Sequence, residues 1–534
     1  MRISRFLCLL LCLSFLLPVF SSCGGGGTES RPSSESESES ESASSSESSS
    51  EEGRDKWEGV SFGGEELIVN VSVHYNDEQT FGPADVYSRG PDSLEGADEV
   101  GKMIYDRNLR LQTRLGLSVT WEETNVKVTF AQGVIENFVR LSPDNSPDLF
   151  INDHSDLIHA MLTGCLWNVY DPTDAGGDPL PSYFDFSHEG WMENFMKGSS
   201  MDSEKRYLLA SDYFIDAIRY AFVLYVNRDL FDETMQGQFL TVHDLYRHVL
   251  VGDWDYLFLK ELIETVYRDT VNKGETDRED EWKGLVASQL FQRAFSWTNG
   301  LSVLEWDGEI YDSTPSVIEN NADYFTFVEN FRDLFNTPGV LYTANDVQAS
   351  TTLFLDGTYL FALSMMGEME SEQVRNSAVN KGVLPIPKFD LTIQDDYHTL
   401  IHNQAEMACI PVNARRFCAA SAYMQMATEE SVAIMKEYYD KSLKLKYNED
   451  KDTQEMLDLI HDRIESPFES VLVRLVMTGA ATLPEAPYQG EAMFNMIYND
   501  AVGNKNEFTS TYAKHYEGWC KNLTRLLEIF ENLE

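Results

Sequence analysis

Short apolar runs separated by helical patterns fill the first half of this chain. Residues 67–73 form an apolar, β-branched run, which predicts a buried strand. Apolar positions at helical spacing predict a helix over residues 98–115 that ends at Gly116. The same alternation continues in predicted strands at 117–121, 148–152, 207–210 and 220–226 and in predicted helices at 135–141 and 155–162. Strands that alternate with helices imply parallel pairing in an α/β layer structure.

Helical patterns dominate the second half. Three further strands are predicted, at residues 358–364, 382–385 and 407–411. The predicted helices of this half cover residues 241–251, 257–270, 419–428, 431–438, 455–463 and 512–532. The C-terminal part is therefore expected to be rich in helix.

The first residues have a different pattern. Arg2 and Arg5 precede an apolar run over residues 6–20, which is followed by two serines and Cys23. This arrangement is typical of an export signal, and the run is shorter than the ~20 apolar residues of a membrane-spanning helix. We therefore expect a lipoprotein signal peptide over residues 1–22 and a lipid on Cys23. A plain secretory signal with an incidental cysteine is the alternative.

The segment after Cys23 has the composition of a tether. Residues 24–52 are almost entirely Gly, Ser and Glu, and such a composition cannot form an apolar core. We expect a disordered tether over residues 23–58 that holds a globular body at the extracellular face of the cell membrane.

Composition narrows the possible functions. The chain has 534 residues and a formal net charge of -47, which would repel a phosphate backbone, so nucleic acid is excluded as a partner. Hydrophobic residues make up 43% of the chain, enough for well-filled cores. The cysteines beyond the leader and anchor are widely spaced and form no CxxC pair: Cys165, Cys409, Cys418 and Cys520. Their spacing indicates no zinc site. One or two disulfides are left open.

Four stretches, in this order, resemble a known family. They are YDRN at 105–108 followed by LGL at 115–117, YVNRDLF at 225–231, GVLPIPK at 382–388 and MACIP at 407–411. Together they resemble the extracellular solute-binding proteins of ABC transporters, in the large carbohydrate-type branch (family 1) that occurs as lipoproteins. The resemblance covers most of the globular body.

This resemblance implies an α/β, two-lobed, periplasmic-binding-protein-like fold of type II. Both lobes would be discontinuous in sequence and joined by a hinge, with ligand held between them. The first lobe would comprise residues 59–212 plus about 404–480, and the second residues 213–403 plus about 481–534. The chain would cross near residues 212–218, return near 402–406 and cross again in the helix-rich C-terminal part.

Candidate ligand-binding residues come from clusters that mostly follow predicted strands, where open α/β sheets bind ligands. A sugar needs aromatic faces for its apolar side and polar groups for its hydroxyls. The candidates are Asn152, Asp153, His154, Asp212, Tyr213, Phe214, Trp297, Asn299, Met366 and Glu368. We favour Trp297, Asp212 and Tyr213. The structural alternatives are that the aromatic residues belong to the core and that Asp212 caps a helix.

Metal sites and cofactors are not expected. Relatives often carry a calcium-binding loop where this chain has residues 272–280, but Lys273 and Arg278 suit such a loop badly. His398 and His402 have a spacing that suits zinc on a helix, yet the residues between them read as strand and no third ligand is near. The chain also has no Gly-x-Ser-x-Gly, phosphate-loop or His-Glu-x-x-His motif.

The sequence thus predicts a lipid-anchored, monomeric receptor rather than an enzyme. It would capture a small solute, with a sugar or oligosaccharide favoured, by closure of a hinge, and would deliver it to an ABC permease. One alternative is an anchored glycoside-processing enzyme, because two carboxylates of so acidic a chain can meet in space. A surface adhesin is the other. The identity of the ligand is left open.

Overall fold

The structure of the protein is a computed structural model that describes most of residues 55–533. The segments outside the described residues are 1–54, 74–88, 126–132, 174–176, 198, 239, 275, 289–293, 311–312, 344–346, 403–404, 447–449, 466–467, 480–482 and 534. Two units are distinguished, Met1–Lys56 and Trp57–Glu534, and the fold described below is that of the second. The predicted signal peptide, Cys23 and nearly all of the predicted tether therefore lie outside the described residues.

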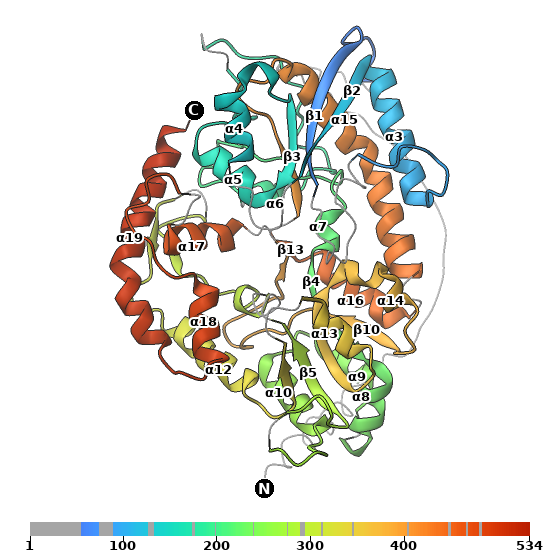
Figure 1. Cartoon of the computed structure of the whole chain (residues 1–534), viewed down its shortest axis with the longest axis vertical. Helices are drawn as coiled ribbons and strands as arrows, with labels where there is room; N and C mark the ends of the chain where they lie inside the picture. Colours follow the sequence, from blue (N-terminus) through green and yellow to red (C-terminus); the bar gives the residue numbers. More distant parts are fainter. Residues whose placement is uncertain are drawn as a thin grey trace, which may run out of the picture. The chain divides into compact units, whose positions relative to one another are not determined.

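A four-stranded sheet, here the first sheet, has the order β12-β3-β1-β2. Its strands are β1 (Glu65–Val73), β2 (Leu117–Asn125), β3 (Leu149–Asp153) and β12 (Glu406–Cys409). β1 runs parallel to both β2 and β3, whereas β12 runs antiparallel to β3. The helical elements near this sheet in sequence are α3 (Glu99–Leu115), α4 (Val134–Leu141), η1 (Pro143–Asn145), α5 (His154–Leu162), α6 (Glu193–Lys197) and α15 (Phe417–Lys436). α15 packs along α3 (Figure 1).

Helix α3 shows how local sequence defines an element. Its N-cap residue is Asp98, whose side chain accepts a hydrogen bond from the Gly101 amide at 2.8 Å. The helix ends at Gly116, whose φ of 58° lies in the left-handed region that favours glycine. A β-carbon at this position would lie 2.5 Å from the Ser61 hydroxyl, so the close approach of the chain also requires glycine.

A five-stranded sheet, the second sheet, has the order β10-β4-β9-β5-β8. Its strands are β4 (Phe222–Asn227), β5 (Lys283–Ala287), β8 (Val340–Tyr342), β9 (Tyr359–Met365) and β10 (Lys381–Leu384). β5 is parallel to β8 and β9, and β4 is antiparallel to β9 and β10. Every residue of β4, β5 and β9 is buried, as expected for strands covered on both faces of their sheet.

Helices and two small sheets complete the described fold. The remaining helical elements are α7 (Asp216–Arg219), α8 (Arg228–Met235), η2 (Gln236–Gln238), α9 (Val242–Leu250), α10 (Tyr256–Val266), α12 (Ala322–Phe335), α13 (Val347–Phe354), η3 (Met366–Glu370), α14 (Glu372–Arg375), η4 (Glu437–Lys446), α16 (Lys451–His461), α17 (Phe468–Thr478), α18 (Met493–Ala501) and α19 (Phe508–Asn532). The small sheets pair β6 (Leu304–Trp306) with β7 (Pro315–Val317) and β11 (Thr399–Leu400) with β13 (Ile464–Glu465).

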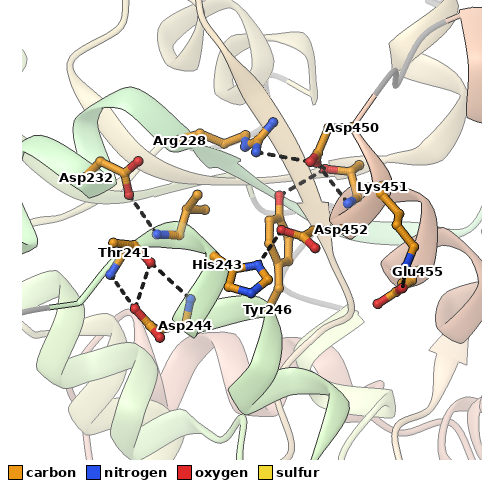
Figure 2. A network of polar contacts seen from close by, with 12 residues as sticks. Arg228, Asp232, Thr241, His243, Asp244, Tyr246, Asp450, Lys451, Asp452 and Glu455 are labelled. Atoms are coloured by element: carbon orange, nitrogen blue, oxygen red, sulfur yellow. Dashed lines mark hydrogen bonds and ion pairs between the residues drawn. The ribbon is translucent and has the colours of Figure 1, made fainter.

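Polar contacts attach α16 to the helices beside the second sheet (Figure 2). The Arg228 guanidinium lies 3.2 Å from Asp450, whose other oxygen accepts from the backbone amide of Thr453 and so caps α16. The Tyr246 and Thr453 hydroxyls are 3.0 Å apart. His243 Nδ1 lies 2.7 Å from the Asp452 carboxylate. These contacts join α8, α9 and α16, which are far apart in sequence, beside β10.

Most of the predicted elements are confirmed within a few residues, and three expectations need correction. The predicted strand at 207–210 contributes only an isolated bridge, from Leu209 to Ala408. The two helices predicted over 419–438 form one helix, α15, that continues into η4. Parallel pairing holds for β1, β2 and β3, but β12 and β4 run antiparallel to their neighbours.

Candidate functional site

Strand direction gives each main sheet one carboxyl edge. In the first sheet, β1, β2 and β3 end at this edge, and the antiparallel β12 begins there with Glu406, which pairs with Asp153. In the second sheet, β5, β8, β9 and β10 end at one edge, and the antiparallel β4 begins there with Phe222. Because open α/β sheets bind ligands outside their carboxyl edges, these two edges define the region to search.

Two segments of chain run between the two edges and meet near both of their ends. We call residues 209–221 the first crossing segment and the described residues 401–402 and 405–408 the second crossing segment. Isolated antiparallel bridges join Leu209 to Ala408 and Ala221 to Ile401, one at each end of the pair. The two carboxyl edges are therefore linked by a pair of antiparallel segments, which is an arrangement that permits hinge motion.

Asp212 lies in the first crossing segment, near the first sheet. Its backbone amide donates to the Gly190 carbonyl at 2.9 Å, which fixes the local turn. Burial of the carboxyl, and next the nearby Glu189, raise the pKa of Asp212 to about 7. Near neutral pH the group therefore exists in both protonation states, so it can donate or accept a hydrogen bond. Asp212 does not directly precede α7, which begins at Asp216.

Tyr213 and Phe214, the other candidates of this cluster, are buried in the structure. The exposed fraction of Tyr213 is 0%, and the Arg107 guanidinium lies over its ring, 4.3 Å from the centroid. The Phe214 ring meets the Tyr213 ring edge-on at 4.9 Å. Burial raises the pKa of Tyr213 well above its ordinary value. Tyr213 thus serves as a packing element in this conformation, and its role in ligand binding stays a prediction.

Met366 and Glu368 lie at the carboxyl edge of the second sheet, in η3. The Met366 amide donates to the Ala221 carbonyl at 2.8 Å, which places η3 against the first crossing segment. Glu368 is 2% exposed. The pKa of Tyr225 is raised well above its ordinary value, mainly because the Tyr225 hydroxyl is buried and also because the Glu368 carboxylate is nearby. The structure thus brings the Asp212 and Glu368 clusters to opposite ends of one crossing segment.

The Asn152 cluster lies at the carboxyl edge of the first sheet. Asn152 is 1% exposed and donates from Nδ2 to Asp156 at 3.0 Å. Asp156 also accepts from the backbone amides of Val134 and Ile135 at the start of α4, so this pair fastens α4 to β3. Asp153 and His154 follow at the junction of β3 and α5.

Trp297 and Asn299 belong to a different local structure. Asn299 is 0% exposed and makes both its hydrogen bonds locally, donating to the Ser296 carbonyl and accepting from the Leu301 amide. The neighbouring Thr298 carbonyl accepts from Gln394, which lies in the loop before β11. Trp297 is half-buried against the core. These observations make Asn299 a turn residue, and the ligand-binding roles of Trp297 and Asn299 stay predictions.

Two residues of the second crossing segment were not among the predicted ligand-binding residues. His402 is 7% exposed, stacks on Tyr220 with ring centroids 6.0 Å apart, and donates from its backbone amide to the Tyr220 carbonyl. Glu406, 3% exposed, begins β12 and faces the Asp153 position of β3. The sequence feature that could have indicated both residues is the predicted return of the chain between the lobes near residues 402–406.

The loop at residues 272–280 is contacted by the side chain of a lysine that begins the next strand, β5. Lys283 is 1% exposed, and its ammonium donates to the backbone carbonyls of Arg278 and Asp280 and lies 4.8 Å from the centroid of the Tyr359 ring. Asp280 accepts from the amides that enclose it, including that of Asp277 at 2.8 Å. Lysine thus supplies positive charge at this loop. Across the described part of the chain, no cluster of three or more His, Cys, Asp or Glu side chains could hold a metal ion.

The four described cysteines, Cys165, Cys409, Cys418 and Cys520, form no disulfide. Among the helices that the structure describes, none has the length and apolar character needed to cross a bilayer.

Comparisons with known proteins support the fold. No family model matches the chain, and no curated protein matches it. The crystal structure of a maltose-binding periplasmic protein from Listeria monocytogenes in complex with maltose is similar over 86% of this chain and 98% of its own, with a TM-score of 0.50 and 12% sequence identity. At this identity the likeness concerns the fold alone. The chain therefore has the mixed α/β, two-lobed, periplasmic-binding-protein-like fold that the resemblance implied.

Proposed function

We propose that this protein is a solute receptor that binds its ligand between the two lobes and closes around it. The observation that carries the proposal is the pair of antiparallel crossing segments between the carboxyl edges of the two sheets. A ligand that contacts both edges binds the closed state better than the open state and so shifts the population toward closure. No chemical change of the ligand is part of this mechanism.

We infer that the ligand is a neutral sugar or oligosaccharide. Carboxyl groups gather around the crossing segments at Asp212, Glu368 and Glu406, and they accept hydrogen bonds from hydroxyls while repelling anionic ligands. Because its pKa is about 7, Asp212 can also donate to a hydroxyl oxygen. The similar Listeria protein was solved with maltose, which is a neutral sugar of this kind.

The setting of the receptor is also a proposal. A lipid on Cys23 would hold the protein at the outer face of the cell membrane, and residues 23–58 would act as a tether. Confinement by a tether raises the effective concentration of the receptor near an ABC permease in the same membrane. The receptor itself would act as a monomer.

The test is a thermal-shift screen of the purified protein against maltose, maltotriose, other neutral glycans, uronic acids and short peptides. Ligand at 100 times Kd stabilises the native state by about 2.7 kcal/mol, so a binder raises the midpoint of unfolding by several degrees. Each binder is then examined by small-angle X-ray scattering, where closure lowers the radius of gyration. Asp212→Ala should weaken binding of the same glycan.

Each outcome distinguishes the alternatives. Binding of neutral glycans with a smaller radius of gyration supports the receptor. A uronic acid or peptide as the preferred ligand would contradict the ligand class. Binding without any change in scattering would contradict hinge closure, and release of shorter sugars during incubation would establish a glycoside-processing enzyme instead.

A further inference from the structure

A helix of unusual geometry forms a third connection between the surroundings of the two sheets. α15, which packs along α3 beside the first sheet, continues directly into η4, a π-helix of 10 residues. The next helix, α16, packs against β10 and α9 beside the second sheet. π-helices are rare and mostly limited to single turns, and they occur frequently at functional sites. η4 thus lies between a helix packed beside the first sheet and a helix packed beside the second sheet.

Two adjacent tyrosines attach η4 to different partners. The Tyr438 hydroxyl donates to the Glu370 carboxylate, which belongs to η3 at the edge of the second sheet. The Tyr439 hydroxyl donates to Asp458 of α16 at 3.0 Å. Lys444 strengthens this second attachment, because its ammonium pairs with Asp458 and lies 4.6 Å from the centroid of the Tyr439 ring. The first attachment thus reaches toward the hinge, and the second stays within the C-terminal helices.

Glu370 also binds the first crossing segment. Its Oε1 atom, which accepts from Tyr438, accepts from Arg219 Nε at 3.3 Å. Arg219 ends α7, and its side chain is only 4% exposed, while Tyr438 is 2% exposed. Hydrogen bonds removed from water in this way are electrostatically stronger than exposed ones. One carboxylate oxygen therefore binds two of the connections between the lobes.

We propose that Glu370 is a positioning residue that couples the first crossing segment to η4, so that these two connections move together. If either connection moved alone, the Glu370 carboxylate, whose side chain is only 16% exposed, would lose one of these two donors, and loss of a hydrogen bond to a charged group costs more free energy than loss of an ordinary one. The coupling makes hinge motion concerted. Its significance for ligand capture rests on the proposed function, but the coupling is a property of the ligand-free protein.

The test is hydrogen-deuterium exchange of the full chain without ligand, read by mass spectrometry. Tyr438→Phe removes only the hydroxyl that reaches Glu370, and Tyr439→Phe is the matched control at the next position. We expect Tyr438→Phe to raise exchange about tenfold both in residues 437–446 and in residues 214–221, since loss of a hydrogen bond to a charged group costs about 1.4 kcal/mol or more. Tyr439→Phe should raise exchange in η4 and α16 and leave residues 214–221 at the wild-type rate.

A second variant approaches the same carboxylate from the other side. Arg219→Gln should raise exchange in residues 437–446, because it removes the other donor to the Glu370 oxygen that Tyr438 binds. This variant tests the proposal if Tyr438→Phe does not fold. Wild-type rates in residues 214–221 of Tyr438→Phe, or in residues 437–446 of Arg219→Gln, would overturn the proposal. Equal effects of the two tyrosine variants on residues 214–221 would also overturn it. Because the exchange experiment uses no ligand, its result does not depend on whether the solute screen finds a binder. A failure of the coupling would likewise leave the result of the solute screen unchanged.

Discussion

Replacement of Asp212 by Asn is expected to change how stability depends on pH. The pKa of Asp212 is raised to about 7 in the folded protein, mainly by burial and then by Glu189, from an ordinary value of 3.8. The folded state therefore binds this proton more tightly than the unfolded state does. The resulting stabilisation is fully present below about pH 4 and is lost as the pH rises to about 7.

The magnitude follows from the two pKa values. A rise from 3.8 to about 7, at 1.36 kcal/mol for each pKa unit, corresponds to roughly 4 kcal/mol. Asp212 is half-buried rather than fully buried, so solvent screening reduces the effect to about 2 kcal/mol. Asn is neutral at every pH and has a similar shape. Relative to the wild type, Asp212→Asn should therefore gain about 2 kcal/mol in free energy of unfolding between pH 4.5 and pH 8.

Urea unfolding at pH 4.5, 6 and 8 measures this difference directly. Glu193→Gln is the control, because it removes an exposed carboxylate on the adjacent helix α6 and should give a curve parallel to the wild type. Glu189→Gln should move the pH midpoint of the wild-type transition downward, since one source of repulsion is gone. An Asp212→Asn variant that differs from the wild type by the same amount at pH 4.5 and pH 8 would refute the reasoning.

Three further predictions concern separate parts of the chain. Lys283→Met should lower the free energy of unfolding by about 2 kcal/mol, because the buried Asp280 carbonyl and the partly buried Arg278 carbonyl lose their ammonium donor. Calcium or EDTA should leave the thermal midpoint of the wild type unchanged, and a calcium-dependent midpoint would contradict this. Lys205→Met should raise amide exchange in the last turn of α19, because the Lys205 ammonium donates to the Phe530 and Leu533 carbonyls at 3.2 and 2.6 Å. The control variant Lys205→Arg should keep most of the protection. Unchanged exchange in Lys205→Met would count against the contact. Cys23→Ala should move the protein from the membrane fraction to the medium in a fractionation assay, whereas retention in the membrane would reject the lipid anchor.

Elements set by local signals could be predicted from the sequence. The helix predicted over residues 98–115 is found as α3 because Asp98, the apolar spacing and Gly116 all act within one helix. The strand predicted at 207–210 fails because its apolar residues indicate burial but not pairing, and in the structure only Leu209 meets β12. The antiparallel direction of β12 could not be predicted from the sequence either, because its partner β3 lies more than 250 positions earlier in the chain.

The candidate site shows the same difference between features set by local sequence and features set by long-range packing. Met366 lies at the carboxyl edge of the second sheet because it directly follows β9, whereas Asp212 was chosen because it follows the predicted strand at 207–210, which forms only one bridge in the structure. Asn299 was chosen because it precedes Gly300 at a predicted transition from helix to loop, yet the structure shows that its side-chain amide forms hydrogen bonds within its own turn, which no spacing rule reveals. Arg219, Glu370 and Tyr438 carry no motif, since the first two are 151 positions apart and the last two are 68 apart. Sequence patterns can therefore place residues at the carboxyl edge of a sheet, whereas contacts such as those of Glu370 depend on packing between distant segments and become visible only in three dimensions.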